Sequence, residues 1–326
     1  MSASKHVVLT IRPRGKPIKR LPKQSTFAFV DSTAELYKKI AGETGYSVHR
    51  LRITKEDGSF VPNDKSTTLE GAGLSANTTV SVKDLGPQIA WRTVFIVEYL
   101  GPILIYPAIY ALRPYIYPYP SLGAPKIPAP TDLQKLSMAV MVLHFIKREF
   151  ETIFIHRFSS STMPWTNIFK NSAHYWLLAG LNIAYWTNSP SSLAQASTLT
   201  SSSPTISNLL TTATPLTQLG LALFALGEVG NFYTHIVLKN LRPAGTTARG
   251  IPKGFGFGMV TCPNYMFEIL AWVGISLVTR SAATVLFVAV AGAQMGVWAK
   301  KKERRYRKEF GAEYKKKKFV MIPGIF

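Results

Sequence analysis

The sequence predicts a bundle of six or seven membrane-spanning helices that follows a small α+β domain at the N-terminus. Hydrophobicity is concentrated after residue 84, where six apolar segments approach the length of about 20 residues that a bilayer helix needs. The 326 residues carry a formal net charge of +21. Basic loops beside apolar segments are typical of membrane proteins, and they argue against a nucleic-acid partner. We therefore expect a cytosolic domain at 1–84 and a transmembrane domain with a basic cytosolic C-terminal tail at 85–326.

The first 84 residues have the pattern of a small mixed domain. Alternating apolar residues predict strands at 6–12, 25–30, 49–54 and 78–83. Asp31-Ser32-Thr33 provides a helix cap before an amphipathic stretch at 34–40, which ends near Gly42 or Gly45. The order of two strands, a helix and two strands resembles a ubiquitin-like β-grasp. Its histidines lack partners at ligand spacing, so we expect a packing or regulatory module without chemistry of its own.

The remainder contains the apolar segments in sequence order. They lie at about 89–112, 133–156, 172–187, 215–238, 259–279 and 282–299. The third is short, and a seventh, re-entrant or split span remains an alternative. A Pro- and Tyr-rich linker at 113–130 joins the first two, and an uncharged Ser/Thr-rich insert at 189–215 is expected to be mobile and dispensable.

Charge asymmetry between the loops predicts the orientation of the bundle. The loop at 239–258 and the tail at 300–318 are rich in Lys and Arg, whereas the alternate loops hold few bases. Because basic loops stay on the cytosolic side, we expect both termini in the cytosol and an even number of spans. The one cysteine, Cys262, fits a reducing compartment.

Polar side chains recur at helical spacing inside the apolar segments. In the fifth segment Asn264, Glu268 and Trp272 share one helix face, and Tyr265 lies beside them. Similar stripes occupy three further segments, and their members are Glu98, His144, Lys147, Arg148, Glu151, Glu228, Asn231, His235, Lys239 and Arg242. Ionisable groups in spans usually face the bundle interior, so the stripes predict one shared polar cavity that opens to the cytosol. A purely structural polar network is the alternative for any single stripe.

The side chains expected in this cavity favour an anionic ligand. Arg and Lys side chains such as Arg148, Arg242 and Lys302 suit phosphates, which favours a nucleotide or an anionic lipid. We expect no metal site, because His144 and His156 lack the spacing of a zinc motif. Phosphate-binding loops and dinucleotide fingerprints are missing too. The glycines at 254–258 favour a flexible hinge over a phosphate contact.

Several sequence motifs, in this order along the chain, resemble those of a known family. They are Val97-Glu98-Tyr99-Leu100-Gly101-Pro102, His144-Phe145-Ile146-Lys147-Arg148-Glu149, Asn231-Phe232-Tyr233-Thr234-His235, Leu241-Arg242-Pro243, Cys262-Pro263-Asn264-Tyr265-Met266-Phe267-Glu268 and Ile322-Pro323-Gly324-Ile325-Phe326. With the N-terminal domain, the chain resembles the very-long-chain trans-2-enoyl-CoA reductases, within the membrane family of steroid 5α-reductases. Phe145 stands where the steroid reductases usually have tyrosine, which favours an acyl-CoA over a steroid.

The resemblance implies NADPH-dependent reduction of a C2–C3 double bond conjugated to a thioester, in the endoplasmic reticulum. It implies that Tyr265 donates the proton, that Lys147 stabilises the phenolate or the enolate, and that Glu98 orients the nicotinamide or the substrate carbonyl. The residues that it places at the cofactor are Arg148, His156, Asn231, His235, Arg242, Asn264, Glu268, Lys302 and Tyr306. It implies as partners a very-long-chain acyl-CoA, membrane lipids and other elongation-cycle enzymes.

Three other functions are compatible with parts of the pattern. A steroid or polyprenol reductase would share the bundle and the cofactor. A membrane methyltransferase would use S-adenosylmethionine and would not need a proton donor at Tyr265. A non-catalytic scaffold that recruits partners through the N-terminal domain would neither bind NADPH nor be stabilised by it.

Overall fold

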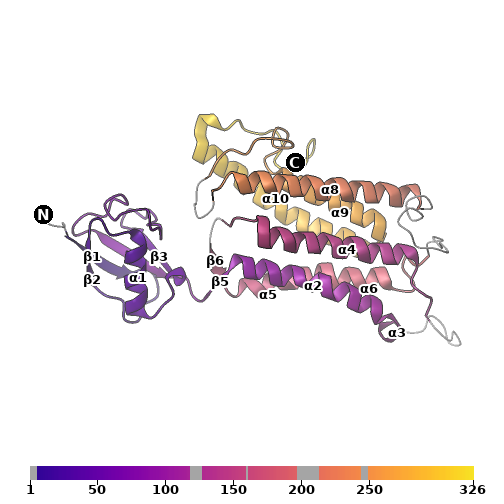
Figure 1. The fold of residues 1–326 in the computed structure, drawn as a ribbon, viewed down its shortest axis with the longest axis horizontal. Helices are drawn as coiled ribbons and strands as arrows, with labels where there is room; N and C mark the ends of the chain where they lie inside the picture. Colours follow the sequence, from indigo (N-terminus) through magenta and orange to yellow (C-terminus); the bar gives the residue numbers. More distant parts are fainter. Residues whose placement is uncertain (1–5, 118–126, 159–160, 197–212, 244–248) are drawn as a thin grey trace. The chain divides into compact units, whose positions relative to one another are not determined.

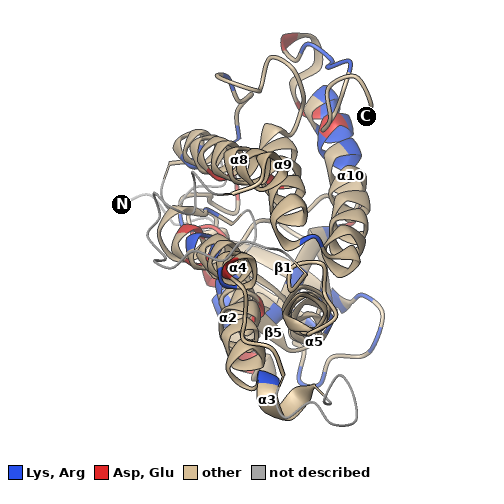
Figure 2. Ribbon diagram, turned by 90° about the vertical axis from the view of Figure 1, so that its right-hand side faces the viewer, with Lys and Arg blue, Asp and Glu red and all other residues tan. Residues whose placement is uncertain are grey.

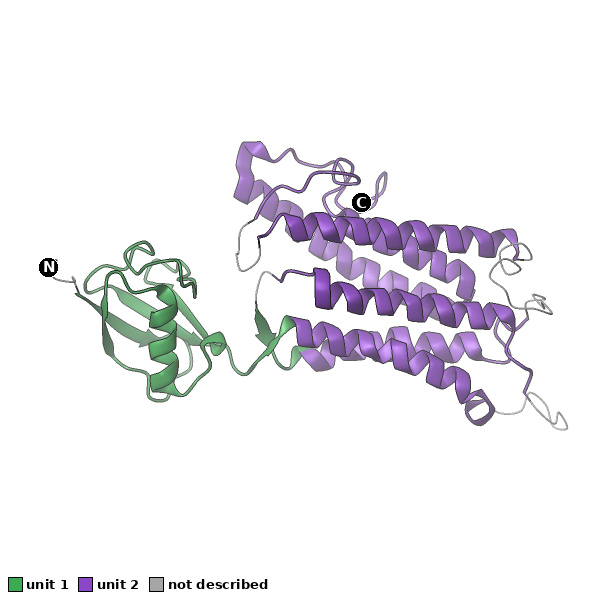
Figure 3. Ribbon diagram, in the orientation of Figure 1, with its two compact units in different colours: residues 1–91, 160–167 green, residues 92–159, 168–326 purple. Residues whose placement is uncertain are grey.

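The computed structural model describes residues 6–117, 127–158, 161–196, 213–243 and 249–326 (Figure 1). The chain forms two compact units (Figure 3). The first contains Met1–Trp91 and Ser160–Asn167, and the second contains Arg92–Ser159 and Ile168–Phe326. The structural boundary lies beyond the predicted residue 84, because strand β5 (Gln88–Ala90) pairs with strand β6 (Thr162–Pro164) from much later in the chain.

The first unit contains a four-stranded sheet and one long helix. Its elements are β1 (His6–Pro13), β2 (Gln24–Ala28), α1 (Thr33–Thr44), the short 3-10 helix Val48–Arg50, β3 (Leu51–Lys55) and β4 (Thr79–Asp84). The sheet order is β2-β1-β4-β3, and the central pair β1–β4 is parallel while both outer pairs are antiparallel. A capping box between Ser32 and Glu35 starts α1, and Gly45 in the left-handed region ends it. The predicted strands and capped helix are confirmed.

Tyr37 makes this unit sensitive to alkaline pH. Its side chain is 1% exposed, and its hydroxyl donates to Val61 O at 2.8 Å and accepts from Ile53 N at 3.0 Å. Burial raises the pKa of Tyr37 to about 12. An unfolded tyrosine has a pKa of about 10, so the buried neutral phenol adds its full share to the free energy of unfolding below pH 10. As the pH rises to 12, the free energy of unfolding falls by up to about 3 kcal/mol.

Urea unfolding of the first unit between pH 8 and 12, followed by circular dichroism, measures this loss. The Tyr37→Phe variant provides the control because it has no phenol to titrate. It should be less stable at pH 8, since two buried backbone groups lose their partner, and it should lack the extra decline above pH 10. Equal pH slopes for both proteins would contradict this assignment.

The second unit is a bundle of long helices that run side by side (Figures 1 and 2). They are α2 (Trp91–Ala111), α3 (Arg113–Ile116), α4 (Asp132–Phe150) with a π-helical end (Glu151–Ile155), α5 (Asn167–Ser172), the π-helix Ala173–Asn182, α6 (Ile183–Asn188), α8 (Pro215–Asn240), α9 (Pro263–Thr279) and α10 (Ala282–Phe310). Among the residues that the structure describes, three helical stretches are long and apolar enough to cross a membrane, namely Trp91–Ala111, Pro215–Asn240 and Ala282–Glu313. The helical membrane part of the fold prediction is confirmed, while the number of six or seven spans stays a prediction.

One sequence expectation about this unit is wrong. The third segment is not short, because helical structure continues from Asn167 to Asn188 through a polar first turn that the hydrophobicity pattern left out. The first residues of the insert at 189–215 make hydrogen bonds to the helices, while its mobility and dispensability stay predictions. Arg113 donates to Gln195 Oε1 at 2.8 Å, and Thr131 donates to Ala194 O at 2.8 Å, so its uncharged residues are tied to buried polar groups. Residues 197–212 of the insert lie outside the described chain.

Glycines bring α8 and α9 into very close contact, and this contact positions the polar residues of both helices. A Cβ atom on Gly227 would lie 2.3 Å from Ala271 N, and one on Gly274 would lie 2.4 Å from Phe224 N. One turn further along, Asn231 Nδ2 donates to Asn264 O at 2.9 Å. Helix α9 also packs against α4 and α10, so it lies at the centre of the polar groups described next.

Candidate active site

The polar stripes of α4, α8 and α9 meet in one network inside the helical unit. Lys147 of α4 is its centre. The ammonium Nζ lies 3.0 Å from Glu151 Oε1 and 3.3 Å from Glu228 Oε2, and it also donates to Asn231 Oδ1. Lys147 therefore makes one hydrogen bond, to Asn231, and two close ion pairs, one with Glu151 of α4 and one with Glu228 of α8.

His144 links the same network to α9. Its Nδ1 lies 2.5 Å from Glu228 Oε1, and its Nε2 lies 3.5 Å from Glu268 Oε1. The imidazole is 2% exposed and packs edge-on against Trp272, whose Nε1 donates to Glu268 at 3.3 Å. The predicted face shared by Glu268 and Trp272 therefore exists, and it faces α4.

Glu151 joins the network to α2 through Arg148. This carboxylate has no exposed surface, and it accepts from Arg148 Nη1 at 2.6 Å while His235 Nδ1 lies 3.0 Å away. Arg148 Nη2 also donates to Tyr99 Oη at 3.1 Å. Glu151 begins the π-helical end of α4, a local widening of the helix that is frequent at functional sites.

One group in this region has the composition of a metal site. Glu151, His156 and His235 each place one potential ligand atom within 4.8 Å of the others. Lys147 and Arg148 already neutralise the Glu151 carboxylate, and their charges would repel a metal ion. We therefore assign Glu151 and His235 to the ion-pair network, with the His156 ring packed against His235.

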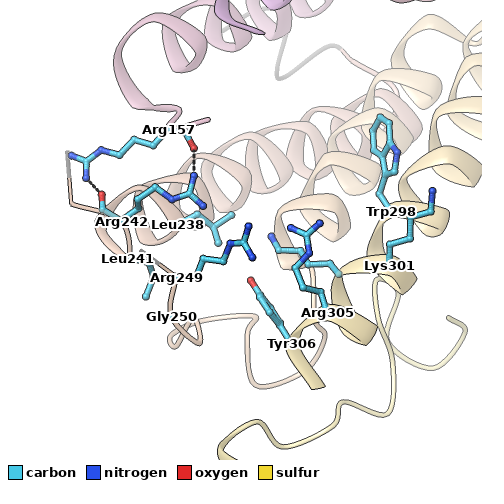
Figure 4. A pocket seen from close by; sticks show the side chains of 11 residues that line it. Arg157, Leu238, Leu241, Arg242, Arg249, Gly250, Trp298, Lys301, Arg305 and Tyr306 are labelled. Carbon is cyan, nitrogen blue, oxygen red and sulfur yellow. Dashed lines mark hydrogen bonds between the residues drawn. The ribbon is translucent and has the colours of Figure 1, made fainter. Parts of the chain in front are cut away.

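A cationic pocket lies where the end of α8 and the segment after it face α10 (Figure 4). Its volume is about 400 Å³. The lining includes the aromatic side chains Trp298 and Tyr306 and six basic residues, namely Arg157, Arg242, Arg249, Lys301, Lys302 and Arg305. Figure 4 shows Arg249, Arg305 and Tyr306 converging on its centre, and Figure 2 shows further Lys and Arg along the same end of α10. Such a combination of cations and flat rings suits a phosphorylated nucleoside.

The polar network and the cationic pocket lie at successive positions along α8 and are connected by residues of this helix. Asn231 and His235 face the network, and Leu238 and Arg242 line the cationic pocket. Asn231 and Leu238 are seven residues apart on α8, so a helical rise of about 1.5 Å per residue separates them by roughly 10 Å along the helix axis. An extended dinucleotide can cover this distance.

Two buried acceptors near the network are available for a ligand. Glu98 of α2 is 1% exposed, and its Oε2 has no hydrogen-bond partner in the described part of the chain. The same holds for Asn264 Oδ1 on the first turn of α9. Because buried polar atoms are normally paired, orphaned acceptors in a polar site favour ligand binding.

Tyr265 follows Asn264 on α9 and packs with Cys262, Met295 and Met321, with its ring 6.4 Å from that of Trp298. The expected proximity of Lys147 to Tyr265 stays a prediction, since the contacts of the ammonium are with two carboxylates and an amide. The structure brings Arg148, Asn231, His235 and Glu268 into the network and Arg242, Lys302 and Tyr306 into the cationic pocket. His156 joins both, through its ring contact with His235 at 4.7 Å and its neighbour Arg157.

Some residues of the site were not among the predicted site residues. Glu151, Glu228 and His144 hold the network together, although the sequence shows them only as members of the stripes. Arg249 and Arg305 complete the cationic pocket. In the sequence, the high content of Lys and Arg in their segments was the one feature that could have indicated them.

A family model described as 3-oxo-5-alpha-steroid 4-dehydrogenase matches residues 161–326, just over half of the chain. The chain belongs to this family. Among relatives, the very-long-chain enoyl-CoA reductase of Dictyostelium discoideum is 40% identical, over 90% of this chain and 92% of its own length. A Schizosaccharomyces pombe protein with an enoyl reductase assignment is 42% identical, over 97% and 98% of the two chains. The trans-2,3-enoyl-CoA reductase-like protein of Bos taurus is 30% identical, over 85% and 72%.

Family membership confirms the resemblance that the sequence motifs indicated. It implies an oxidoreductase with a nicotinamide cofactor and, through the reductase relatives, an acyl-CoA substrate. The cationic pocket, the orphaned Asn264 acceptor and the stripe between them fit such a cofactor, because it carries phosphates at one end and an amide at the other.

Proposed function

We propose that this chain is an NADPH-dependent very-long-chain trans-2-enoyl-CoA reductase of the endoplasmic reticulum membrane. It reduces the C2–C3 double bond in the last step of the fatty-acid elongation cycle. The proposal rests on the series of α8 residues that connects a pocket lined by six Lys and Arg side chains to a buried network of carboxylates and amides. The chain also belongs to a family of nicotinamide-dependent reductases.

The cationic pocket would hold the phosphates and the adenosine of NADPH. Arg242 and Lys302 provide charge there, and Tyr306 provides a ring for the base. At the other end of the stripe, Asn231 and Asn264 offer amide groups to the nicotinamide. When bound there, NADPH supplies the hydride that reduces C3 of the substrate.

The protein's own residues manage the proton and the developing negative charge. As hydride reaches C3, negative charge collects on the thioester oxygen and a proton must reach C2. Tyr265 donates this proton, and Lys147 supplies the nearby positive charge that stabilises the enolate or the phenolate. Glu98 orients the thioester or the nicotinamide through its free buried oxygen.

The architecture supports this assignment at a membrane boundary. We propose six or seven spans with cytosolic termini, so that the nucleotide ends of NADPH and CoA stay cytosolic while the acyl chain lies among the apolar helices. The N-terminal unit is proposed to be ubiquitin-like, supported by its sheet order and by α1, which lies in the chain between the antiparallel pairs β1–β2 and β3–β4. Membrane lipids and other elongation-cycle enzymes are the proposed partners.

Arg305→Glu should weaken NADPH binding about tenfold or more while changing NADH binding much less. A charged contact to the extra phosphate of NADPH contributes about 1.5–3 kcal/mol, and charge reversal removes it. The neighbouring Arg304→Glu is the matched control, because Arg304 is exposed and does not line the cationic pocket. Thermal stabilisation by each cofactor measures the affinities, and equal losses for both variants would contradict the phosphate role.

The activity is tested by following NADPH absorbance with the purified chain in detergent. A long-chain trans-2-enoyl-CoA should cause oxidation, and a 3-oxo-4-ene steroid or a polyprenol should not. If NADPH were oxidised with the steroid or the polyprenol and not with the enoyl-CoA, the substrate would be a steroid or a polyprenol instead of an acyl-CoA. Protein that neither binds nor oxidises NADPH would refute the reductase.

A further inference from the structure

Six ionisable side chains of alternating basic and acidic character form an unbroken series of contacts across α4, α8 and α9. In order they are His235, Glu151, Lys147, Glu228, His144 and Glu268. Each contact joins a nitrogen of one member to a carboxylate oxygen of the next. A series of this kind can pass protons, because every member can both accept one and give one up.

The first half of the series lies between α8 and the end of α4. His235 Nδ1 and Lys147 Nζ both lie 3.0 Å from Glu151 Oε1. Glu151 has no exposed surface and contributes a single oxygen to both neighbours, while its other oxygen accepts from Arg148 at 2.6 Å. Water therefore has no access to the carboxylate that connects the two bases.

The second half crosses from α4 to α9. Lys147 Nζ lies 3.3 Å from Glu228 Oε2, and the other oxygen of Glu228 lies 2.5 Å from His144 Nδ1. The opposite nitrogen of His144 lies 3.5 Å from Glu268 Oε1. A neutral imidazole has one donor and one acceptor nitrogen, so a His144 that faces carboxylates on both sides is set to take a proton from one and give it to the other.

One end of the series lies near the cationic pocket, and the other end lies near Tyr265 in the sequence of α9. The His235 ring contacts the half-buried His156 at 4.7 Å, and the next residue, Arg157, lines the cationic pocket. At the far end, Glu268 is three residues after Tyr265 on α9, a spacing that places two side chains on neighbouring positions of one helix surface.

We propose that these six side chains form a proton relay that supplies the reduction. The inference rests on the proposed function, in which each turnover consumes one hydride and one proton. Tyr265 gives its phenolic proton to C2, and the resulting phenolate recovers one from Glu268. Each relay member then takes a proton from its neighbour, and one enters from the cytosol at His156 and His235, so the relay returns to its starting charge.

The membrane setting explains why such a relay is needed. Chains of acidic residues and histidines inside membrane segments commonly conduct protons, because bulk water does not reach them. A purely structural network would hold the helices together equally well but would not move protons. The two roles therefore differ in proton-transfer kinetics, and not in stability.

The variant Glu228→Gln separates the two roles. Glutamine keeps the shape and can hydrogen-bond His144 and Lys147, but it cannot carry a proton. Using the full chain in detergent with NADPH and a long-chain trans-2-enoyl-CoA, we expect kcat to fall about tenfold with KM and NADPH stabilisation little changed, since a positioned proton transfer contributes at least this much. The solvent deuterium isotope effect on kcat should increase.

The control is Glu313→Gln, which alters an exposed glutamate after the end of α10. This residue belongs neither to the relay nor to the lining of the cationic pocket. Its kcat and isotope effect should match the wild type. An active wild type with unchanged kcat and isotope effect in Glu228→Gln would overturn the relay alone. A rate loss without a larger isotope effect would do the same, whereas an inactive wild type would refute the proposed function as well.

Discussion

Replacing Tyr265 with phenylalanine is expected to lower turnover roughly a hundredfold or more, the usual contribution of a positioned acid. The ring would still pack with Cys262, Met295 and Met321, so the fold should survive. Only the hydroxyl is lost, and with it the proposed proton donor to C2. The enolate formed by hydride transfer would then depend on a poorly placed donor.

Single-turnover and steady-state NADPH oxidation measure the loss, and the rise in melting temperature with NADPH reports cofactor binding. Tyr115→Phe is the control, because Tyr115 is an exposed tyrosine of α3 outside the polar network. Loss of NADPH stabilisation in parallel with kcat would assign Tyr265 to cofactor binding instead of proton donation.

The Gly274→Ala substitution is expected to have the largest effect on stability. The new Cβ would lie 2.4 Å from Phe224 N and 2.5 Å from Gly220 O, and backbone atoms cannot rotate away as a side chain does. Helices α8 and α9 must therefore separate, at a cost of about 3 kcal/mol or more in the free energy of unfolding. Because Asn231 and Asn264 are bonded across the same helix pair, NADPH binding should weaken too.

Gly292→Ala on α10 is the matched control. Its Cβ would meet Ile269 Cδ1 at 3.2 Å, and the end of a flexible side chain can shift by the few tenths of an ångström required. Denaturation in detergent, with and without NADPH, compares the two variants. Similar stability of both would contradict the close packing of α8 on α9.

Much of the fold was predictable because its determinants are local. Alternation placed the strands of the first unit, and Ser32 with Glu35 specified the start of α1. Hydrophobic runs placed the long helices but not their polar ends, which is why helical structure at Asn167–Ser172 was missed. The pairing of β5 with β6 joins residues over seventy positions apart, and no local pattern encodes it.

The candidate site was predictable helix by helix and not as a whole. Helical spacing identified His144, Lys147 and Glu228 as members of inward-facing stripes. It did not reveal that Glu228 bridges the other two, because contacts between helices depend on rotation and axial offset, which here follow from glycine contacts between α8 and α9. The cationic pocket combines a loop, Arg249, with one face of α10, Arg305, and periodicity cannot join such segments.

The most direct test of the central claim follows the two hydrogens into the product. The wild-type chain is given a long-chain trans-2-enoyl-CoA with NADPH deuterated on its reactive face, in ordinary water, and then with ordinary NADPH in deuterium oxide. Mass spectrometry of the saturated acyl chain should find deuterium at C3 in the first case and at C2 in the second. Deuterium at the opposite positions, or no saturated product from protein that binds NADPH, would contradict the proposed reductase.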